Sequence, residues 1–235
     1  MLNKPFRILS TKVLSPGVAG LATRAGVQLD MLDFIDISLL ADEAVAGIVA
    51  AIPAHALLVF TSANAARAFA HITPPHHHWQ IACLEGATRA ALPEQATVVL
   101  TAPHADALAT QLLEFPALKE VYYLCGDQRR DTIPTRLREN GIHVSERIVY
   151  HNTATPQKIN NHYDALLFFS PTAVKSFFSV NALPSTTRCF AIGHTTGAAL
   201  QATTHNDIIT ADNPAAATLL QMAIDHLEHH YNSNA

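Results

Sequence analysis

The sequence is poor in charged residues, and this shortage limits what the protein can bind. Only 14% of its 235 residues are Asp, Glu, Lys or Arg, and 15 basic residues against 19 acidic ones give a net charge of −4 with histidine neutral. Such a chain has no overall basic field to attract nucleic acid or an acidic membrane surface. Because 49% of the residues are apolar, a disordered chain is also excluded. We expect a globular protein with neither a nucleic-acid nor a membrane partner, in which local groups hold any anionic ligand.

Cysteines and long apolar runs are scarce as well. Cys83, Cys125 and Cys189 are odd in number and far apart, unlike a disulfide framework or a CxxC metal pair. They predict reduced, buried thiols. No apolar run reaches the roughly 18 to 20 residues that span a bilayer, and the first residues lack the pattern of a signal peptide. We expect a cytoplasmic protein that works as a monomer.

The common nucleotide-binding patterns are absent. The sequence contains neither GxGxxG nor a P-loop, which argues against a dinucleotide or nucleoside triphosphate enzyme. Histidines gather at His76-His77-His78 and at His226 with His230, and we interpret both groups as surface residues rather than metal ligands. We therefore predict no metal site and no cofactor.

Short apolar segments alternate with Ala-rich helical patterns along the chain. The expected strands are Arg7–Thr11, Leu57–Thr61, Gln80–Leu84, Val98–Thr101, Val121–Cys125, Ala165–Ser170, Arg188–Ile192 and Asp207–Thr210. The expected helices are Pro16–Arg24, Asn64–His71, Thr88–Leu92, Ala105–Leu113, Thr132–Asn140, Thr172–Phe178, Thr195–Gln201 and Pro214–His229. Most of these strands are apolar on both faces, as buried parallel strands are. The alternation predicts an α/β fold.

Half of the chain is present twice. Residues 59–69 (VFTSANAARAF) align with residues 167–177 (LFFSPTAVKSF), and residues 83–92 align with residues 191–200. Positions 59 and 167 differ by 108, and so do positions 83 and 191. Two unrelated strand–helix units would rarely keep one spacing by chance, so the pattern indicates an internal duplication.

The last unit of each copy stands at a different place in the chain. In the first copy it runs from Tyr122 through a helix that closes at Gly141 to a long strand, Val144 to Tyr150. The equivalent pieces of the second copy stand near the N-terminus, with a helix that closes at Gly26 and a strand from Leu29 to Ile37. Both glycines suit the left-handed residue that follows a helix. The duplication is therefore circularly permuted.

We predict two similar doubly wound, flavodoxin-like α/β domains with parallel sheets, joined by two crossing strands, one domain being inserted in the other. The discontinuous domain comprises residues 1–36 and 153–235, and the inserted domain comprises residues 38–151. A ligand cleft between two such domains would face the carboxyl ends of the strands and the N-termini of the helices of both.

The chain resembles the uroporphyrinogen-III synthase family over nearly its whole length. The segments that carry the resemblance are Phe60–Ala65 (FTSANA), Tyr123–Pro134 (YLCGDQRRDTIP), Phe168–Ala173 (FFSPTA) and Ala191–Leu200 (AIGHTTGAAL). The resemblance implies a cofactor-free lyase of haem biosynthesis. Its substrate would be linear hydroxymethylbilane, which the family closes to uroporphyrinogen III, with inversion of the last ring through a spiro intermediate and loss of water.

The implied substrate carries eight carboxylates, and the residues at the predicted strand–helix turns suit such a ligand. Hydroxyls and backbone N–H groups at helix N-termini bind anions. The residues of this kind are Ser62, Thr88, Ser170, Thr195 and Thr196. Each could instead be only an N-cap, which contributes about 1 kcal/mol to its own helix.

Basic and amide side chains complete the predicted binding set. Arg129 and Arg130 follow Gly126 in a strand–helix loop, where a guanidinium could hold a carboxylate with two hydrogen bonds. Lys12 ends the first strand, and Asn64 stands beside Ser62. We predict substrate-binding roles for Arg130, Lys12 and Asn64.

Tyr150, at the end of the long strand, matches the tyrosine that the family uses as a proton donor. A phenol with a reference pKa near 10 can donate a proton at neutral pH but is a poor base. The alternative is a tyrosine that merely covers a domain junction. A second function also stays open at this stage, because a non-catalytic binder of a small polyanion would show the same duplication and the same loops.

Overall fold

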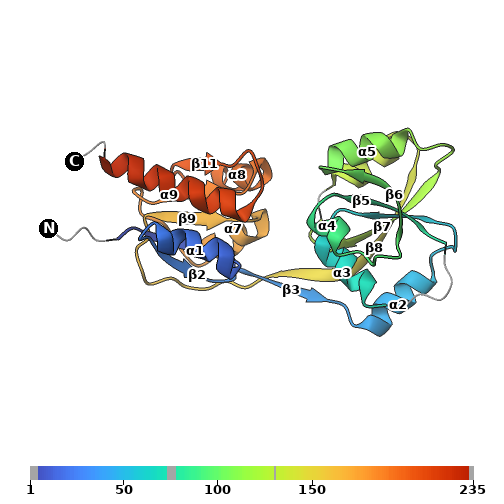
Figure 1. Cartoon of the computed structure of the whole chain (residues 1–235), viewed down its shortest axis with the longest axis horizontal. Helices are drawn as coiled ribbons and strands as arrows, with labels where there is room; N and C mark the ends of the chain where they lie inside the picture. Colours follow the sequence, from blue (N-terminus) through green and yellow to red (C-terminus); the bar gives the residue numbers. More distant parts are fainter. Residues whose placement is uncertain (1–4, 73–77, 130, 233–235) are drawn as a thin grey trace. The chain divides into compact units, whose positions relative to one another are not determined.

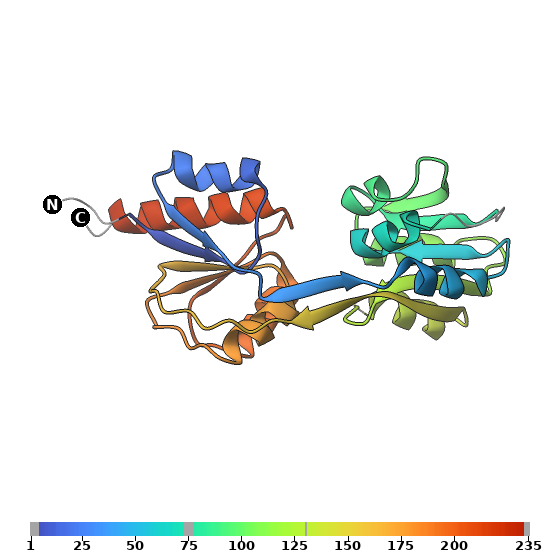
Figure 2. The same ribbon diagram turned by 90° about the horizontal axis from the view of Figure 1, so that it is seen from below.

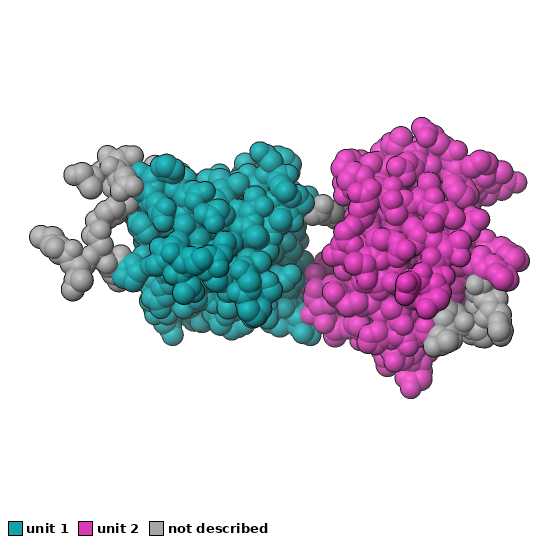
Figure 3. Space-filling view, viewed as in Figure 1, with its two compact units in different colours: residues 1–36, 153–235 teal, residues 37–152 magenta. Residues whose placement is uncertain are grey.

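The computed structural model describes residues 5–72, 78–129 and 131–232. The chain divides into two compact units, coloured separately in Figure 3: unit 1 comprises residues 1–36 and 153–235, and unit 2 comprises residues 37–152. Within the described part of the chain, no helix combines the length and hydrophobicity that crossing a membrane requires.

Unit 1 is a five-stranded parallel sheet with helices on both faces. Its elements are β1 (Arg7–Ser10), α1 (Pro16–Arg24), β2 (Gln28–Met31), β9 (Ala165–Phe168), α7 (Pro171–Phe178), β10 (Arg188–Ala191), α8 (His194–Gln201), β11 (Ile208–Thr210) and α9 (Ala216–Asn232). The strand order is β11-β10-β9-β1-β2, and every neighbouring pair is parallel. Helices α1 and α9 cover one face, and α7 and α8 cover the other (Figure 2).

Unit 2 has a six-stranded sheet with helices on both faces. Its elements are α2 (Asp42–Ala50), β4 (Leu57–Phe60), α3 (Ala63–Ala70), β5 (Gln80–Leu84), α4 (Ala87–Ala90), β6 (Thr97–Ala102), α5 (Ala105–Leu113), β7 (Glu120–Gly126) and α6 (Thr132–Glu139). Two further strands, β3 (Ile35–Leu39) and β8 (His143–Ala154), carry the chain between the units. The strand order is β3-β8-β7-β4-β5-β6 (Figure 1). Four of its neighbouring strand pairs are parallel, whereas the edge strand β3 runs antiparallel to β8, since Leu40 bonds to Val149 and Thr155 bonds to Phe34.

The central strands β4 and β9 are apolar and buried at every position, with sequences LLVF and ALLF. Successive side chains of a strand point to opposite faces. In β4, Leu58 and Phe60 therefore enter the core beneath α2 and α3, while Leu57 and Val59 enter the core beneath α5 and α6. The predicted α/β fold with two parallel-sheet domains is confirmed, and the three cysteines are free and buried.

The duplication is visible in three dimensions. Strands β4 and β9 begin at residues 57 and 165, and helices α3 and α7 begin at residues 63 and 171, so each pair keeps the spacing of 108. The N-terminal β1–α1–β2 of unit 1 lies beside β9, and β7–α6–β8 of unit 2 lies in the same way beside the corresponding strand β4. Counted along the chain, the order in unit 1 is 2-1-3-4-5, the flavodoxin-like order.

Some details differ from the sequence predictions. The expected strand from Leu29 to Ile37 is wrong, because two strands, β2 and β3, occupy that stretch. Between them, the carboxylate of Asp33 accepts the backbone N–H of Val13 at 2.9 Å, and the chain leaves the sheet of unit 1 there. Helix α2 is an addition to the predicted elements, and it directly follows β3.

The interpretation of His226 as a surface residue is also wrong. Its ring lies edge-on against Phe190, at 5.7 Å between centroids, because α9 packs over the sheet. His78 is exposed and stacks on His55. His76 and His77 lie outside the described residues, as does the side chain of His230.

At two glycines of unit 2, substitution by alanine should change the stability of the fold in opposite directions. Gly47 lies in the exposed middle of α2 with open space around its Cα, so Gly47→Ala should stabilise the fold by about 0.5–1 kcal/mol. Gly141 follows α6 with φ of +77°, so Gly141→Ala should destabilise it by about 1–2 kcal/mol. Urea unfolding of both variants measures the difference. Two shifts of the same sign would show that backbone conformation does not govern these two positions.

Candidate active site

The carboxyl edge of each sheet contains a point where the winding direction reverses. The reversal lies between β1 and β9 in unit 1 and between β4 and β7 in unit 2. Open parallel sheets bind ligands at such points, because the loops after the two strands diverge to opposite faces. The residues that follow these strands include Thr11 and Ser170 in unit 1, and Thr61, Ser62 and Asp127 in unit 2.

In unit 2, a β-bulge brings Tyr150 to this edge. Cys125 pairs with Ile148, but the next residue of β7, Gly126, pairs with Tyr150, so Val149 is an extra residue in β8. Val149 and Tyr150 consequently both pack into the core beneath α2 and α3, although they are neighbours in a strand. A bulge re-aims a side chain in this way.

The Tyr150 ring lies directly on the backbone of Gly126. A Cβ atom at residue 126 would stand 2.4 to 2.8 Å from the ring and hydroxyl of Tyr150, distances at which atoms clash. Gly126 has no unusual φ, so the need for glycine is purely steric. The sequence indicates Gly126 only as the start of a loop. The signal was a glycine as the last residue of a buried strand, where a close approach is a common reason for glycine.

Hydroxyl groups of the turn after β4 lie near this tyrosine. The side chain of Ser62 acts on Tyr150 as a hydrogen-bonding neighbour that lowers its pKa, and it also caps α3 by accepting the backbone N–H of Asn64 at 3.2 Å. Next to it, Thr61 and Tyr123 share a hydrogen bond of 2.6 Å between their hydroxyl oxygens. Sequence patterns do not single out Thr61 and Tyr123. Tyr123 lies in the middle of β7 and Thr61 follows β4, and their separation of 62 residues gives no sign that the two side chains meet.

Burial further favours the neutral form that both phenols already have at pH 7. Tyr150 is only 8% exposed, and this desolvation raises its pKa above the ordinary value, while the hydrogen bond from Ser62 lowers it. Burial also raises the pKa of Tyr123, to about 12. Both side chains are therefore neutral phenols at pH 7. Each can donate a proton, and neither can serve as a base.

Unit 1 presents a similar set of polar groups. Ser170 caps α7 by accepting the backbone N–H of Ala173 at 3.1 Å, as Ser62 caps α3. Thr11 is buried and donates its hydroxyl to the carbonyl of Leu167 at 2.7 Å. Lys12, the next residue, is exposed. A cation and a helix N-terminus therefore follow the two strands that flank the reversal point.

Thr88 and Thr196 occupy equivalent positions in the two copies of the repeat. They are 6% and 1% exposed, and each lies in the first turn of the helix after the second strand of its copy. The hydroxyl of Thr196 has no hydrogen-bond partner among the described residues, whereas Thr195 beside it is exposed. Thr195 is thus the threonine of this pair whose side chain reaches solvent.

The remaining predicted residues differ in what they contact. The side-chain oxygen of Asn64 accepts a hydrogen bond from Arg67. Arg129 is held by two carboxylates of its own chain, Glu146 and Asp131, so its guanidinium is already paired. Arg130 lies outside the described residues.

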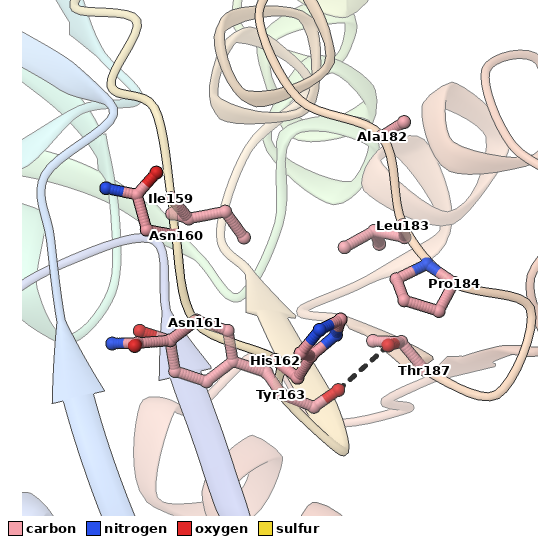
Figure 4. Close-up of a pocket in the computed structure, with 9 residues that line it drawn as sticks. All are labelled: Ile159, Asn160, Asn161, His162, Tyr163, Ala182, Leu183, Pro184 and Thr187. Carbon is pink, nitrogen blue, oxygen red and sulfur yellow. Dashed lines mark hydrogen bonds between the residues drawn. The ribbon is translucent and has the colours of Figure 1, made fainter.

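The hollows described in the structure lie away from these residues. One of about 350 Å³ is lined by Ile159 to Tyr163 and by Ala182, Leu183, Pro184 and Thr187 (Figure 4). These residues precede β9 and β10, so the hollow is at the amino edge of the sheet of unit 1. It contains none of the predicted site residues. Among the described residues, no three His, Cys, Asp or Glu side chains gather as a metal site requires.

The geometry around Tyr150 predicts its response to a single substitution. Because the Ser62 hydrogen bond stabilises the phenolate, Ser62→Ala should raise the already elevated pKa of Tyr150 further. The difference in ultraviolet absorbance between each protein and its Tyr150→Phe counterpart during alkaline titration isolates this group. Ser170→Ala removes the matching helix cap from unit 1 and should leave the titration unchanged. A lower pKa in Ser62→Ala would contradict the assignment.

Comparison with known proteins agrees with this architecture. A search of curated proteins found no match. Among solved structures, uroporphyrinogen-III synthetase from Helicobacter pylori is similar with a TM-score of 0.67 and 18% identity, covering 94% of this chain and 99% of that one. A mutant uroporphyrinogen III synthase from Thermus thermophilus gives a TM-score of 0.64 at 14% identity, covering 95% of this chain and 99% of that one. At these identities the two likenesses show the fold.

The family assignment comes from a family model, which is matched over most of the chain. The model described as uroporphyrinogen-III synthase HemD matches residues 18–221, a range that includes the Gly126–Tyr150 contact and the capping serines of both units. The chain therefore belongs to the uroporphyrinogen-III synthase family.

Proposed function

We propose that this protein closes hydroxymethylbilane to uroporphyrinogen III, acting as a hydro-lyase with Tyr150 as its proton donor. The observation that carries the donor role is the neutral phenol of Tyr150, held at the reversal point of unit 2 by Gly126 and Ser62. Membership of the family supplies the substrate, and the geometry supports the role.

The reaction asks for one proton at the start and releases one at the end. Loss of the substrate hydroxyl as water requires a donor within hydrogen-bond reach of that oxygen. Ring closure then releases a proton from the last pyrrole ring, so the donor can be restored without a cofactor. The pyrrole nitrogens supply the electrons, and the protein folds the chain and keeps reactive intermediates from water.

We propose that the carboxyl edges of both sheets supply the contacts to the eight substrate carboxylates. In unit 1 these are Lys12, Ser170, Thr195 and the backbone N–H groups of the turn at Thr196. In unit 2 they are Ser62, Asn64, Arg130 and the turn at Thr88. The exposed cation of Lys12 and the helix N-termini of both units support this proposal, since both attract anions.

We also propose that the enzyme is a cytoplasmic monomer. Free, buried thiols at Cys83, Cys125 and Cys189 suit a reducing compartment. The proposed contacts all come from one chain, so a second copy is not needed to complete them. Sedimentation with and without substrate tests the oligomeric state.

The Tyr150→Phe variant tests the donor role. It keeps the ring over Gly126 and removes only the hydroxyl, so turnover should fall about 10²-fold or more while KM stays nearly constant. Type III product measured by isomer separation should still predominate in the residual activity, because the protein's grip on the last ring is unchanged. Near-normal turnover would assign the proton to water or to a substrate carboxylate. A wild-type protein that yields only the type I isomer would instead be a non-catalytic binder.

The Lys12→Ala variant tests anion binding in unit 1. An exposed ion pair contributes about 0.2–1 kcal/mol, so KM should rise by about 1.4-fold to five-fold at low salt, with kcat little changed. The rise should shrink as salt is added, because exposed charges are screened. Lys119→Ala is the matched control, since Lys119 is an exposed lysine at the opposite, amino end of a strand. Equal effects of the two substitutions would reject a specific role for Lys12.

A further inference from the structure

The carboxylate of Asp127 binds the strand segment that follows Tyr150. Its Oδ1 accepts the backbone N–H of Asn152 at 2.8 Å, and its Oδ2 lies 3.2 Å from Nδ1 of His151. The backbone N–H of Asp127 also donates to the carbonyl of Tyr150, at 3.3 Å. One residue therefore contacts three consecutive residues of β8.

These contacts lie where β7 stops pairing with β8, whose other edge is paired with β3. Strand β7 ends at Gly126, and the regular register between β7 and β8 has already shifted at the bulge one residue earlier. Beyond the bulge, the pairing of β8 with β7 consists of the single pair Gly126–Tyr150. The Asp127 side chain takes the place that the next ladder partner would occupy, because it accepts the N–H group that a longer β7 would have bonded.

The surroundings keep Asp127 ionised for this purpose. Burial acts to raise its pKa, but hydrogen bonds from Asn152, His151 and the backbone of Gln128 outweigh it and hold the pKa below the ordinary value. Both carboxylate oxygens are thus occupied. A free carboxylate would also repel a substrate with eight carboxylates, so a direct substrate contact is the weaker interpretation of this residue.

We propose that Asp127 is a positioning residue for Tyr150: by clamping β8 at His151 and Asn152, it holds the Tyr150 ring on Gly126 and its hydroxyl on Ser62. The inference rests on the proposed function only for its effect on turnover. Its structural part concerns where the Tyr150 phenol lies.

Two substitutions at this position separate the clamp from the charge. Asp127→Ala removes both acceptors, so kcat should fall about ten-fold or more with KM within two-fold of wild type. Asp127→Asn keeps a carbonyl oxygen for the N–H of Asn152 and should recover most of that loss. Asp131→Ala is the control, because Asp131 is an exposed carboxylate of the same loop that pairs with Arg129 instead. It should leave kcat unchanged.

A double variant tests whether Asp127 acts through the tyrosine. In the Tyr150→Phe background, Asp127→Ala should cause no further fall in kcat, since the group it positions is gone. A further ten-fold fall would overturn the proposal, as would wild-type kcat in the single variant Asp127→Ala.

The titration of Tyr150 tests the positioning without any activity. Both Asp127→Ala and Asp127→Asn remove the carboxylate charge that helps to raise the pKa of Tyr150, but only Asp127→Ala releases the ring. In difference titrations against the matching Tyr150→Phe double variants, the Tyr150 pKa should therefore lie closer to the ordinary value of a tyrosine in Asp127→Ala than in Asp127→Asn. Equal midpoints in the two folded variants would overturn the proposal. If Tyr150→Phe keeps normal turnover but the two midpoints differ in this direction, the donor role fails and the positioning role stands.

Discussion

The central strands β4 and β9 have no polar face, and most of the architecture follows from that constraint. Each strand consists of four buried apolar residues, so helices must cover both faces of its sheet. Right-handed crossovers to either side of a central strand then require the winding to reverse next to it. The reversal leaves the loops after β1, β4, β7 and β9 spread to opposite faces. The candidate site thus lies at the carboxyl edge of each sheet, where these loops diverge.

In unit 2, the position of Tyr150 depends on the absence of a side chain at Gly126. Because Gly126 has no Cβ, the ring of Tyr150 can lie on the end of β7, and the bulge at Val149 turns it there. The ring is buried against this backbone, which raises the pKa of its phenol, while Ser62 acts in the opposite direction. Packing, protonation and orientation of the proposed donor therefore depend on a single contact between a ring and a glycine.

Two arginines that follow β7 in the chain pair with carboxylates of unit 2. Arg129 is shared between Glu146 and Asp131, and Arg138 also binds Glu146 at 2.7 Å. The pairs with Glu146 tie the loop after β7, and helix α6, to β8. Among the described residues of this loop, the guanidinium of Arg129 is therefore used within the protein.

Local signals in the amino-acid sequence were enough to predict the fold class, the family and the repeated unit. Fully apolar strands, capping serines at 62 and 170 and a constant spacing can each be recognised without knowledge of spatial neighbours. The order of the family's motifs also singled out Tyr150.

Only the tertiary structure shows the contacts of the candidate site. No sequence pattern identified Tyr123 and Thr61, the clamp of Asp127 on β8, or the pairing that occupies Arg129. Those contacts join residues 17 to 62 positions apart across neighbouring strands. Only the register of the sheet, including its one-residue bulge, decides which side chains meet there.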